Sequence, residues 1–370
     1  MSSTDDSINR DALTRLINLV KPALSTQDYI PALKHILFAG GFASAYNDSA
    51  AIQVALPTRD LDLGLCLPGD MLGKALGSFN AEKVMLQPNE KDGSLVLASG
   101  RARIKVKTLP SSSYPLELPK GKAPRLALSD EILAGIRRCL MSVGNNPHHP
   151  AGMGVTLDVA DGLAVLYSTD NATISRYQTK SKLSLPGDSP VILPTFFCEQ
   201  LVSLAKALPK TEIDLAMHAG ALLAEFFNAG GEVEARLFSK TLTDMTPLDF
   251  PRIVAKHCDV AKIIKQLEAV PVAFDAAFDR ALLVMGAEVD KFTKVTPGDG
   301  VIKLLSTGAD GEASDSIAFE PANPGDPFNL DPTLIARASK NCTHLVFANR
   351  VVVFSDSDGR FLHLVSHCSN

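Results

Sequence analysis

The 370-residue sequence predicts an α+β protein in which one small module, an amphipathic helix followed by antiparallel strands, occurs six times. Helix candidates recur about every 55 to 80 residues and begin near Ser7, Pro68, Ser129, Pro194, Phe274 and Asp331. Each is followed by short runs in which apolar and polar residues alternate. Taken in pairs, the six modules predict three domains of ordinary size, spanning residues 1–124, 125–252 and 253–370.

The helix candidates carry start signals as well as periodicity. Pro68, Pro194 and Pro332 stand at helix starts, where a missing backbone N–H costs nothing, and Ser129 is a good N-cap. Apolar residues then follow the i, i+3, i+4, i+7 spacing of a buried helix face. Examples are Leu13, Leu16, Ile17 and Val20; Ile132, Ile136, Cys139 and Leu140; and Phe197, Leu201, Leu204 and Leu208.

The strand candidates come in hairpins joined by turn residues. Residues 94–99 and 101–107 meet at Gly100, residues 222–227 and 232–238 meet across 228–231, and residues 350–355 and 360–365 meet across 356–359. The run 101–107 alternates strictly, with Ala102, Ile104 and Val106 on one face and four cations on the other. Proline-containing segments at 115–124 and 246–257 are expected to be linkers.

Composition excludes several classes of protein. Hydrophobic residues make up 46% and charged residues 21% of the chain, and no apolar run is long enough for a membrane helix. The polar N-terminus lacks a signal-peptide pattern, so we expect a cytoplasmic protein that does not contact membrane. The six cysteines form no Cys-x-x-Cys pair, and His148-His149 has no partner at ligand spacing, so we expect free thiols, a loop histidine pair, no metal and no cofactor. The absence of recognised catalytic motifs favours a protein that is not an enzyme.

Charge alone does not favour nucleic-acid binding, because the net charge is −5. However, the later turns of the helix candidates are rich in lysine and arginine, whereas their acids stand in the first turns, where helix dipoles favour them. The helices can therefore present basic faces on an acidic chain. Ordinary solvated faces would show the same pattern, so composition leaves both readings open.

Five motifs in fixed order resemble one known family. They are Gly100-Arg-Ala-Arg-Ile104 with Thr108-Leu-Pro110 and Tyr114-Pro115; Ser168-Thr-Asp170; Leu248-Asp-Phe-Pro-Arg-Ile253; Phe274-Asp-Ala-Ala-Phe-Asp-Arg-Ala281; and Phe328-Asn-Leu330. Together they resemble the bacterial DNA polymerase III beta subunit, the sliding-clamp family, over essentially the whole chain. The resemblance implies three similar DNA-clamp domains, each with two helices packed on antiparallel sheets, closing into a ring as a head-to-tail homodimer.

The resemblance also implies partners and sites. The partners would be double-stranded DNA held without sequence preference, the replicative DNA polymerase, the clamp loader and other proteins with a clamp-binding motif. DNA would be contacted by Arg15, Lys74, Arg137, Arg138, Lys206, Arg337 and Lys340. The dimer would join an edge strand carrying Ile104 and Val106 to a helix end at Leu283 and Val284; plain core positions are the alternative reading of these residues.

A peptide-binding pocket is implied at Thr169, Asp170, Ile174, Leu248, Arg252, Ile253, Leu364 and Val365. The sequence departs from the family pattern here. The family's Gly-His-Arg-Leu reads Asn171-Ala-Thr-Ile174, and its Met-Pro-Met-Arg-Leu ending reads 365–370, Val-Ser-His-Cys-Ser-Asn. Such departures are typical of a divergent member, such as a phage-encoded one.

Two other classes of function remain open from the sequence. A repeat-built structural or scaffold protein would use the same modules without binding DNA. A multidomain enzyme would instead show one deep pocket with convergent titratable groups.

Overall fold

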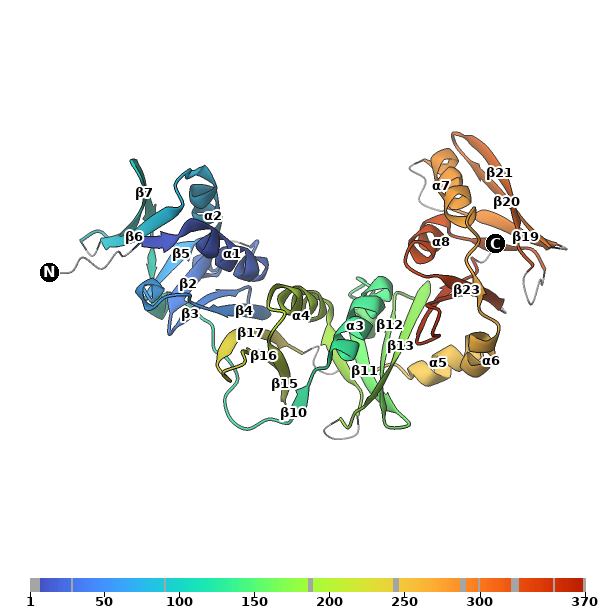
Figure 1. Cartoon of the computed structure of the whole chain (residues 1–370), viewed down its shortest axis with the longest axis horizontal. Helices are drawn as coiled ribbons and strands as arrows, with labels where there is room; N and C mark the ends of the chain where they lie inside the picture. The colour runs from blue at the N-terminus through green and yellow to red at the C-terminus, as the bar shows by residue number, and fades with distance from the viewer. Residues whose placement is uncertain are drawn as a thin grey trace. The chain divides into compact units, whose positions relative to one another are not determined.

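The computed structural model describes residues 7–27, 29–89, 91–185, 189–241, 246–286, 291–298, 300–320, 326–348 and 350–368 (Figure 1). The chain forms two compact units, residues 1–129 with 196–243 and residues 130–195 with 244–370. Each unit contains helices and antiparallel sheets, which confirms the α+β prediction. Within the described ranges, no helix has both the length and the apolarity needed to cross a membrane.

The first unit contains two sheets. A four-stranded sheet has the order β1 (Ser7–Asn9), β6 (Lys83–Asn89), β7 (Ser94–Ser99), β8 (Ala102–Lys107). A nine-stranded sheet has the order β10 (Arg125–Ala127), β15 (Glu212–His218), β16 (Ala221–Phe227), β17 (Val233–Lys240), β4 (Ala50–Ala55), β3 (Phe42–Tyr46), β2 (His35–Ala39), β5 (Leu65–Pro68), β9 (Leu109–Pro110). Its helices are α1 (Arg10–Val20), α2 (Gly69–Ser78) and nearly all of α4 (Thr195–Ala207).

The second unit repeats this plan. An eight-stranded sheet has the order β14 (Val191–Pro194), β11 (Gly154–Ala160), β12 (Leu163–Thr169), β13 (Thr173–Lys182), β25 (Phe361–Ser366), β24 (Val351–Ser355), β23 (His344–Ala348), β18 (Glu268–Ala269). A four-stranded sheet has the order β21 (Gly311–Ala318), β20 (Val301–Gly308), β19 (Thr293–Gly298), β22 (Phe328–Leu330). Its helices are α3 (Asp130–Cys139), α5 (Phe250–His257), α6 (Val260–Lys265), α7 (Phe274–Met285) and α8 (Pro332–Ser339).

All six predicted helices are present, and each begins within three residues of its expected start. The apolar face predicted for α1 is buried, with Leu13, Leu16, Ile17 and Val20 at most 4% exposed. The prediction of a linker at 246–257 is wrong, because α5 occupies much of that segment and α6 follows it. Each of these short helices begins at an aspartate cap: Asp249 accepts from the Arg252 N–H and Asp259 from the Lys262 N–H. The domain boundary expected at residue 252 falls inside α5.

The long sheets arise where modules join edge to edge. Strand β4 pairs with β17 through five residue pairs, from Ala50↔Ser239 to Val54↔Ala235. Strand β13 pairs with β25 in the same antiparallel manner, from Thr173↔Val365 to Tyr177↔Phe361. These junctions remove four strand edges from solvent. Among the described strands that still end a sheet, the two longest are β8 and β21, each at one end of a four-stranded sheet.

Candidate functional site

A cleft of about 430 Å³ lies in the second unit, between the segment that precedes β11 and the turn that joins β12 to β13. Leu248, just before α5, also borders it. The full lining is Gly144, Asn145, Asn146, His148, His149, Pro150, Ala151, Gly152, Thr169, Asp170, Asn171, Thr246 and Leu248. An open cleft of this size with apolar and amide groups can hold a few residues of an extended peptide.

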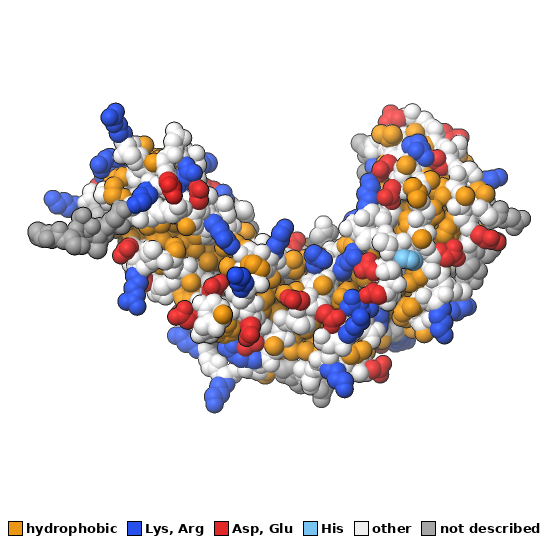
Figure 2. Space-filling model, viewed as in Figure 1, with side chains coloured by type: hydrophobic (Ala, Val, Ile, Leu, Met, Phe, Trp, Pro, Cys, Tyr) orange, Lys and Arg blue, Asp and Glu red, His pale blue; other side chains and the backbone are white. Residues whose placement is uncertain are grey.

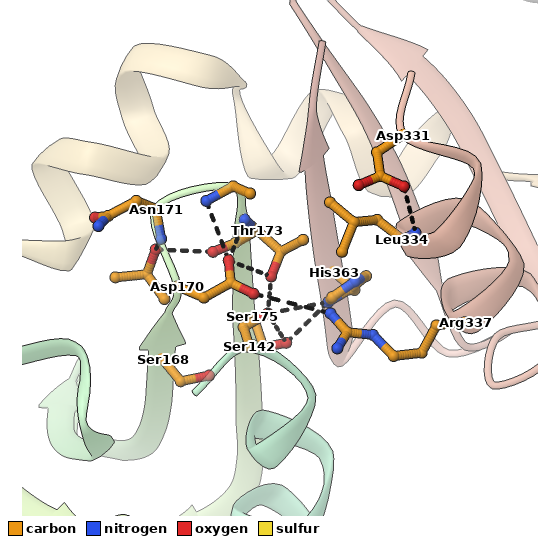
Figure 3. Close-up of polar contacts among 12 residues, drawn as sticks. Ser142, Ser168, Asp170, Asn171, Thr173, Ser175, Asp331, Leu334, Arg337 and His363 are labelled. Atoms are coloured by element: carbon orange, nitrogen blue, oxygen red, sulfur yellow. Dashed lines mark hydrogen bonds and ion pairs between the residues drawn. The ribbon is translucent and has the colours of Figure 1, made fainter. Parts of the chain in front are cut away.

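The β12–β13 turn is fixed by its own side chains (Figure 3). The Asp170 carboxylate accepts hydrogen bonds from the Ala172 N–H at 3.1 Å and from the Thr173 N–H at 2.6 Å. The Thr173 hydroxyl donates to the same oxygen at 2.9 Å. Asn171 has the left-handed φ of 74° that a tight turn requires and that asparagine tolerates. The wall of the cleft is therefore a preformed turn.

Behind this turn lies a buried polar network (Figure 3). The Ser142 hydroxyl lies 2.9 Å from the Thr173 hydroxyl and 2.8 Å from the Ser175 hydroxyl. His363 Nδ1 lies 3.0 Å from Ser175 Oγ and 3.2 Å from Ser142 Oγ. His363 is fully buried, and its Nε2 has no hydrogen-bond partner among the described residues. Burial, helped by the positive charge of Arg337, lowers the pKa of His363 to about 3, so the imidazole is neutral.

The structure brings most of the predicted peptide-pocket residues together. Thr169, Asp170 and Leu248 line the cleft. Four residues share one hydrophobic cluster, which also contains the stacked rings of Tyr167 and Phe250; they are Ile174, Leu248, Ile253 and Leu364. Val365 pairs with Thr173 across β13 and β25. Arg252 is exposed on α5 and is outside the lining of the cleft.

Sequence reasoning missed the opposite wall of the cleft, residues 144–152. Asn146 shapes this wall, because its side chain accepts from the His148 N–H at 2.9 Å and its carbonyl accepts from the His149 N–H at 2.9 Å. The signal was present in the turn-forming run Asn-Asn-Pro-His-His-Pro, in which the histidines were correctly placed in a loop. The described residues contain no group of three metal-ligating side chains, there or elsewhere.

The seven predicted DNA-contacting cations differ in how free they are. Lys74, Arg137 and Lys206 are exposed and form no ion pair with a described residue. Arg15 donates to the Ala207 carbonyl at the end of α4, beside Lys206 in a shallow pocket. Two others face a carboxylate: Lys340 forms a hydrogen-bonded ion pair with Asp279 at 2.8 Å, and Arg337 lies 3.9 Å from Asp170. On the face in Figure 2, basic and acidic side chains are interspersed.

Arg138 is the exception among these cations. Its guanidinium donates to both carboxylate oxygens of Asp356, at 2.7 and 2.8 Å, and to the Asn341 carbonyl at 2.7 Å. The same group lies 5.1 Å from the centre of the Phe361 ring. This bidentate, stacked arrangement ties α3 to the β24–β25 hairpin, so Arg138 has a structural role whatever else it contacts.

The four predicted interface residues lie on or near the two unpaired edges. On β8, Val106 is 4% exposed and belongs to the core of its own unit, whereas Ile104 is half-buried. On α7, Leu283 is 75% exposed, which is unusual for a leucine, and Val284 is half-buried. The β8 edge carries exposed cations at Arg101, Arg103, Lys105 and Lys107. Exposed acids stand at and beside β21, with Glu312 in the strand, Asp310 in the turn before it and Glu320 just after its end.

Neither a protein-family profile nor a curated protein sequence matches this chain. Solved structures do. A beta sliding clamp of Caulobacter crescentus superposes with a TM-score of 0.82 at 20% identity, covering 98% of both chains. The DNA polymerase III beta chain of Streptococcus pneumoniae gives 0.81 at 18% identity, and the beta subunit of Thermotoga maritima gives 0.79 at 14%, each covering 98% of this chain and 99% of the other.

This chain has the sliding-clamp fold. The match spans both units, so the fold resemblance inferred from the motifs is confirmed for the whole described chain. The low identity of 14 to 20% is consistent with the absence of a match by sequence comparison alone.

Proposed function

We propose that this protein is a DNA sliding clamp, a non-enzymatic processivity factor that encircles duplex DNA and tethers the replicative DNA polymerase. The observation that carries the proposal is a full-length clamp fold with unpaired module edges at β8 and β21. The modules already join edge to edge twice within the chain. Two copies arranged head to tail would repeat this junction twice more and close a ring, which is a heterologous contact that closes.

Charge supports the same pairing of edges. The β8 edge is basic and the β21 edge is acidic, so each edge repels a copy of itself and attracts the other. Exposed Leu283 would be covered in such a contact. This gives the proposed homodimer a direction, because β8 of one copy pairs with β21 of its partner.

A topological experiment tests the function without a clamp loader. Linear duplex DNA with cohesive ends is mixed with the protein and then closed by ligation, and the product is separated by gel filtration in high salt. We expect the protein to elute with the closed circles and to be released by one restriction cut, because a ring is held by linkage and contacts to phosphates are screened. Retention that does not change upon cutting, or no retention at all, contradicts the proposal and favours a scaffold.

The free helix cations provide a second test. Reversing Lys74, Arg137 and Lys206 to glutamate should weaken binding of the dimer to a short duplex at least tenfold in low salt. The slope of log K against log salt should also fall by up to about 5, since the dimer loses six cations and each lost phosphate contact removes roughly 0.9. Fluorescence anisotropy measures both quantities.

A matched control variant has the same change in net charge, made at three cations elsewhere on the surface. Lys256, Lys262 and Lys303 are exposed cations on α5, α6 and β20, and their reversal should weaken binding less than threefold. Equal losses in the two triple variants would contradict a DNA surface on the helices. Arg138 is left unchanged, because its contacts with Asp356 and Phe361 are structural.

We further propose that the cleft in the second unit receives short hydrophobic peptide segments of the polymerase, the clamp loader and other clamp-binding proteins. Its preformed turn at Asp170, the adjoining cluster of Ile174, Leu248 and Leu364, and its size support this assignment. The changed residues at 171–174 and the polar wall at 144–152 indicate a peptide preference of its own for this clamp.

A further inference from the structure

We propose that His363, which lies behind the cleft and does not line it, is a positioning residue for peptide binding. It would act through the Ser142 and Ser175 hydroxyls on Thr173, and so on the Asp170 turn that forms one wall of the cleft. The inference rests on the proposed peptide-binding role of the cleft. It is carried by the hydrogen-bond geometry of five buried or half-buried side chains (Figure 3).

The hydrogen bonds form one continuous network. The Thr173 hydroxyl lies 2.9 Å from the Asp170 carboxylate and 2.9 Å from the Ser142 hydroxyl, and both oxygens can accept its proton. Ser142 lies 2.8 Å from Ser175, and either of these two hydroxyls can be the donor.

The network ends at His363. Both serine hydroxyls lie within 3.2 Å of His363 Nδ1. Placing the single proton of the neutral ring on Nε2 would leave a buried N–H donor unpaired, because Nε2 has no partner among the described residues. Nδ1 therefore carries the proton and donates it to the serine hydroxyls, which anchors the network.

The network joins two elements that are far apart in sequence. Ser175 on β13 lies opposite His363 on β25 in the sheet, and Ser142 follows α3. Removing the Nδ1–H of His363 leaves the Ser142 and Thr173 hydroxyls free to reorient. Asp170 then loses its hydroxyl donor and one restraint on its side chain. The Ala172 and Thr173 N–H groups still reach Asp170, so the turn should loosen and not unfold. Loosening a preformed wall weakens binding because ordering it again opposes the peptide.

The test compares variants in the full-length protein. His363→Leu removes the donor and keeps an apolar side chain, whereas His363→Asn keeps an N–H near the place of Nδ1 and should rescue. Ser142→Ala interrupts the hydrogen-bond network without changing the histidine. It therefore tests the same proposal if His363→Leu fails to fold. His367→Leu is the matched control, because His367 is a half-buried histidine that also has a buried, unpaired Nε2, but its ring stacks on Phe328 and lies outside the network.

Two readouts separate positioning from general stability. Hydrogen exchange over residues 169–175 should be at least tenfold faster in His363→Leu and Ser142→Ala than in wild type, and near wild type in His363→Asn and His367→Leu. Binding of a fluorescein-labelled pentapeptide with leucine and phenylalanine side chains should weaken at least fivefold in the same two variants only.

The two proposals fail in different ways. A wild-type protein that does not bind the pentapeptide contradicts the peptide role of the cleft. Unchanged exchange of the turn in folded His363→Leu and Ser142→Ala overturns the positioning role of His363. Equal effects in His367→Leu would also overturn it, because they would show a loss of stability with no specific link to the turn.

Discussion

Reversing Arg103 and Lys107 to glutamate is expected to convert the proposed dimer into monomers. Both cations are exposed on the unpaired β8 edge, and neither has an ion pair with a described residue. In the proposed ring they face the acidic β21 edge, so each reversal replaces an attraction by a repulsion. We expect the dissociation constant to rise about a hundredfold, since each 1.4 kcal/mol is a factor of ten. Sedimentation over a range of protein concentrations and salt measures it.

A charge swap makes this result specific. Adding Asp310→Lys and Glu312→Lys to the same chain restores opposite charges across the head-to-tail contact, and dimerisation should recover most of its strength. Reversing Lys294 and Lys303, exposed cations on the inner strands β19 and β20, is the control with equal change of charge. A dimer unaffected by the β8 reversal, or not restored by the swap, would show that these edges do not meet.

The second large effect is a loss of folding stability at acidic pH. The pKa of His363 is about 3 in the folded protein, against an ordinary value of 6.5. Between these two pH values the unfolded chain binds a proton at His363, whereas the folded chain does not. Stability is therefore highest above pH 6.5 and is lost as pH falls toward 3. Between pH 7 and pH 5, this one group should remove about 2 kcal/mol from the free energy of unfolding. His367, whose burial lowers its pKa to about 4, acts in the same direction.

Urea denaturation at pH 7 and pH 5 measures this loss. His363→Asn cannot titrate, so its free energy of unfolding should fall by about 2 kcal/mol less than that of wild type over the same interval. His218→Asn, at the end of β15 and outside the buried network, is the matched control. The same pH dependence in His363→Asn and wild type would mean that His363 is not the source of the acid sensitivity.

Much of the fold could be predicted because its signals are local. The helix faces, the proline and serine starts and the hairpin turns each depend on residues within one or two turns of the chain. The strand run at 101–107 shows this well, because its alternation predicted the outward cations of β8 and the buried Val106. Helices α5 and α6 were missed because they are short, and because Pro251 was taken as a linker signal although it lies in a first helical turn.

The candidate site was only half predictable. The resemblance named Asp170, Ile174 and Leu364 as pocket residues, and the structure places Ile174 opposite Leu364 in the sheet. The wall at 144–152 and the network through Ser142 and His363 were not predicted, because their members lie up to 221 residues apart and meet only in the folded sheet.

By itself, the sequence determined the order and type of the elements, the modular repeat and the basic character of the helices, since these depend on near neighbours along the chain. Only the tertiary structure decided which cations are free. Arg137 and Arg138 are adjacent, and no sequence pattern separates them, yet one is exposed and the other is held by Asp356. Successive residues of a helix point about 100° apart, so one faces solvent while the next meets a hairpin that folds back from more than 200 positions away.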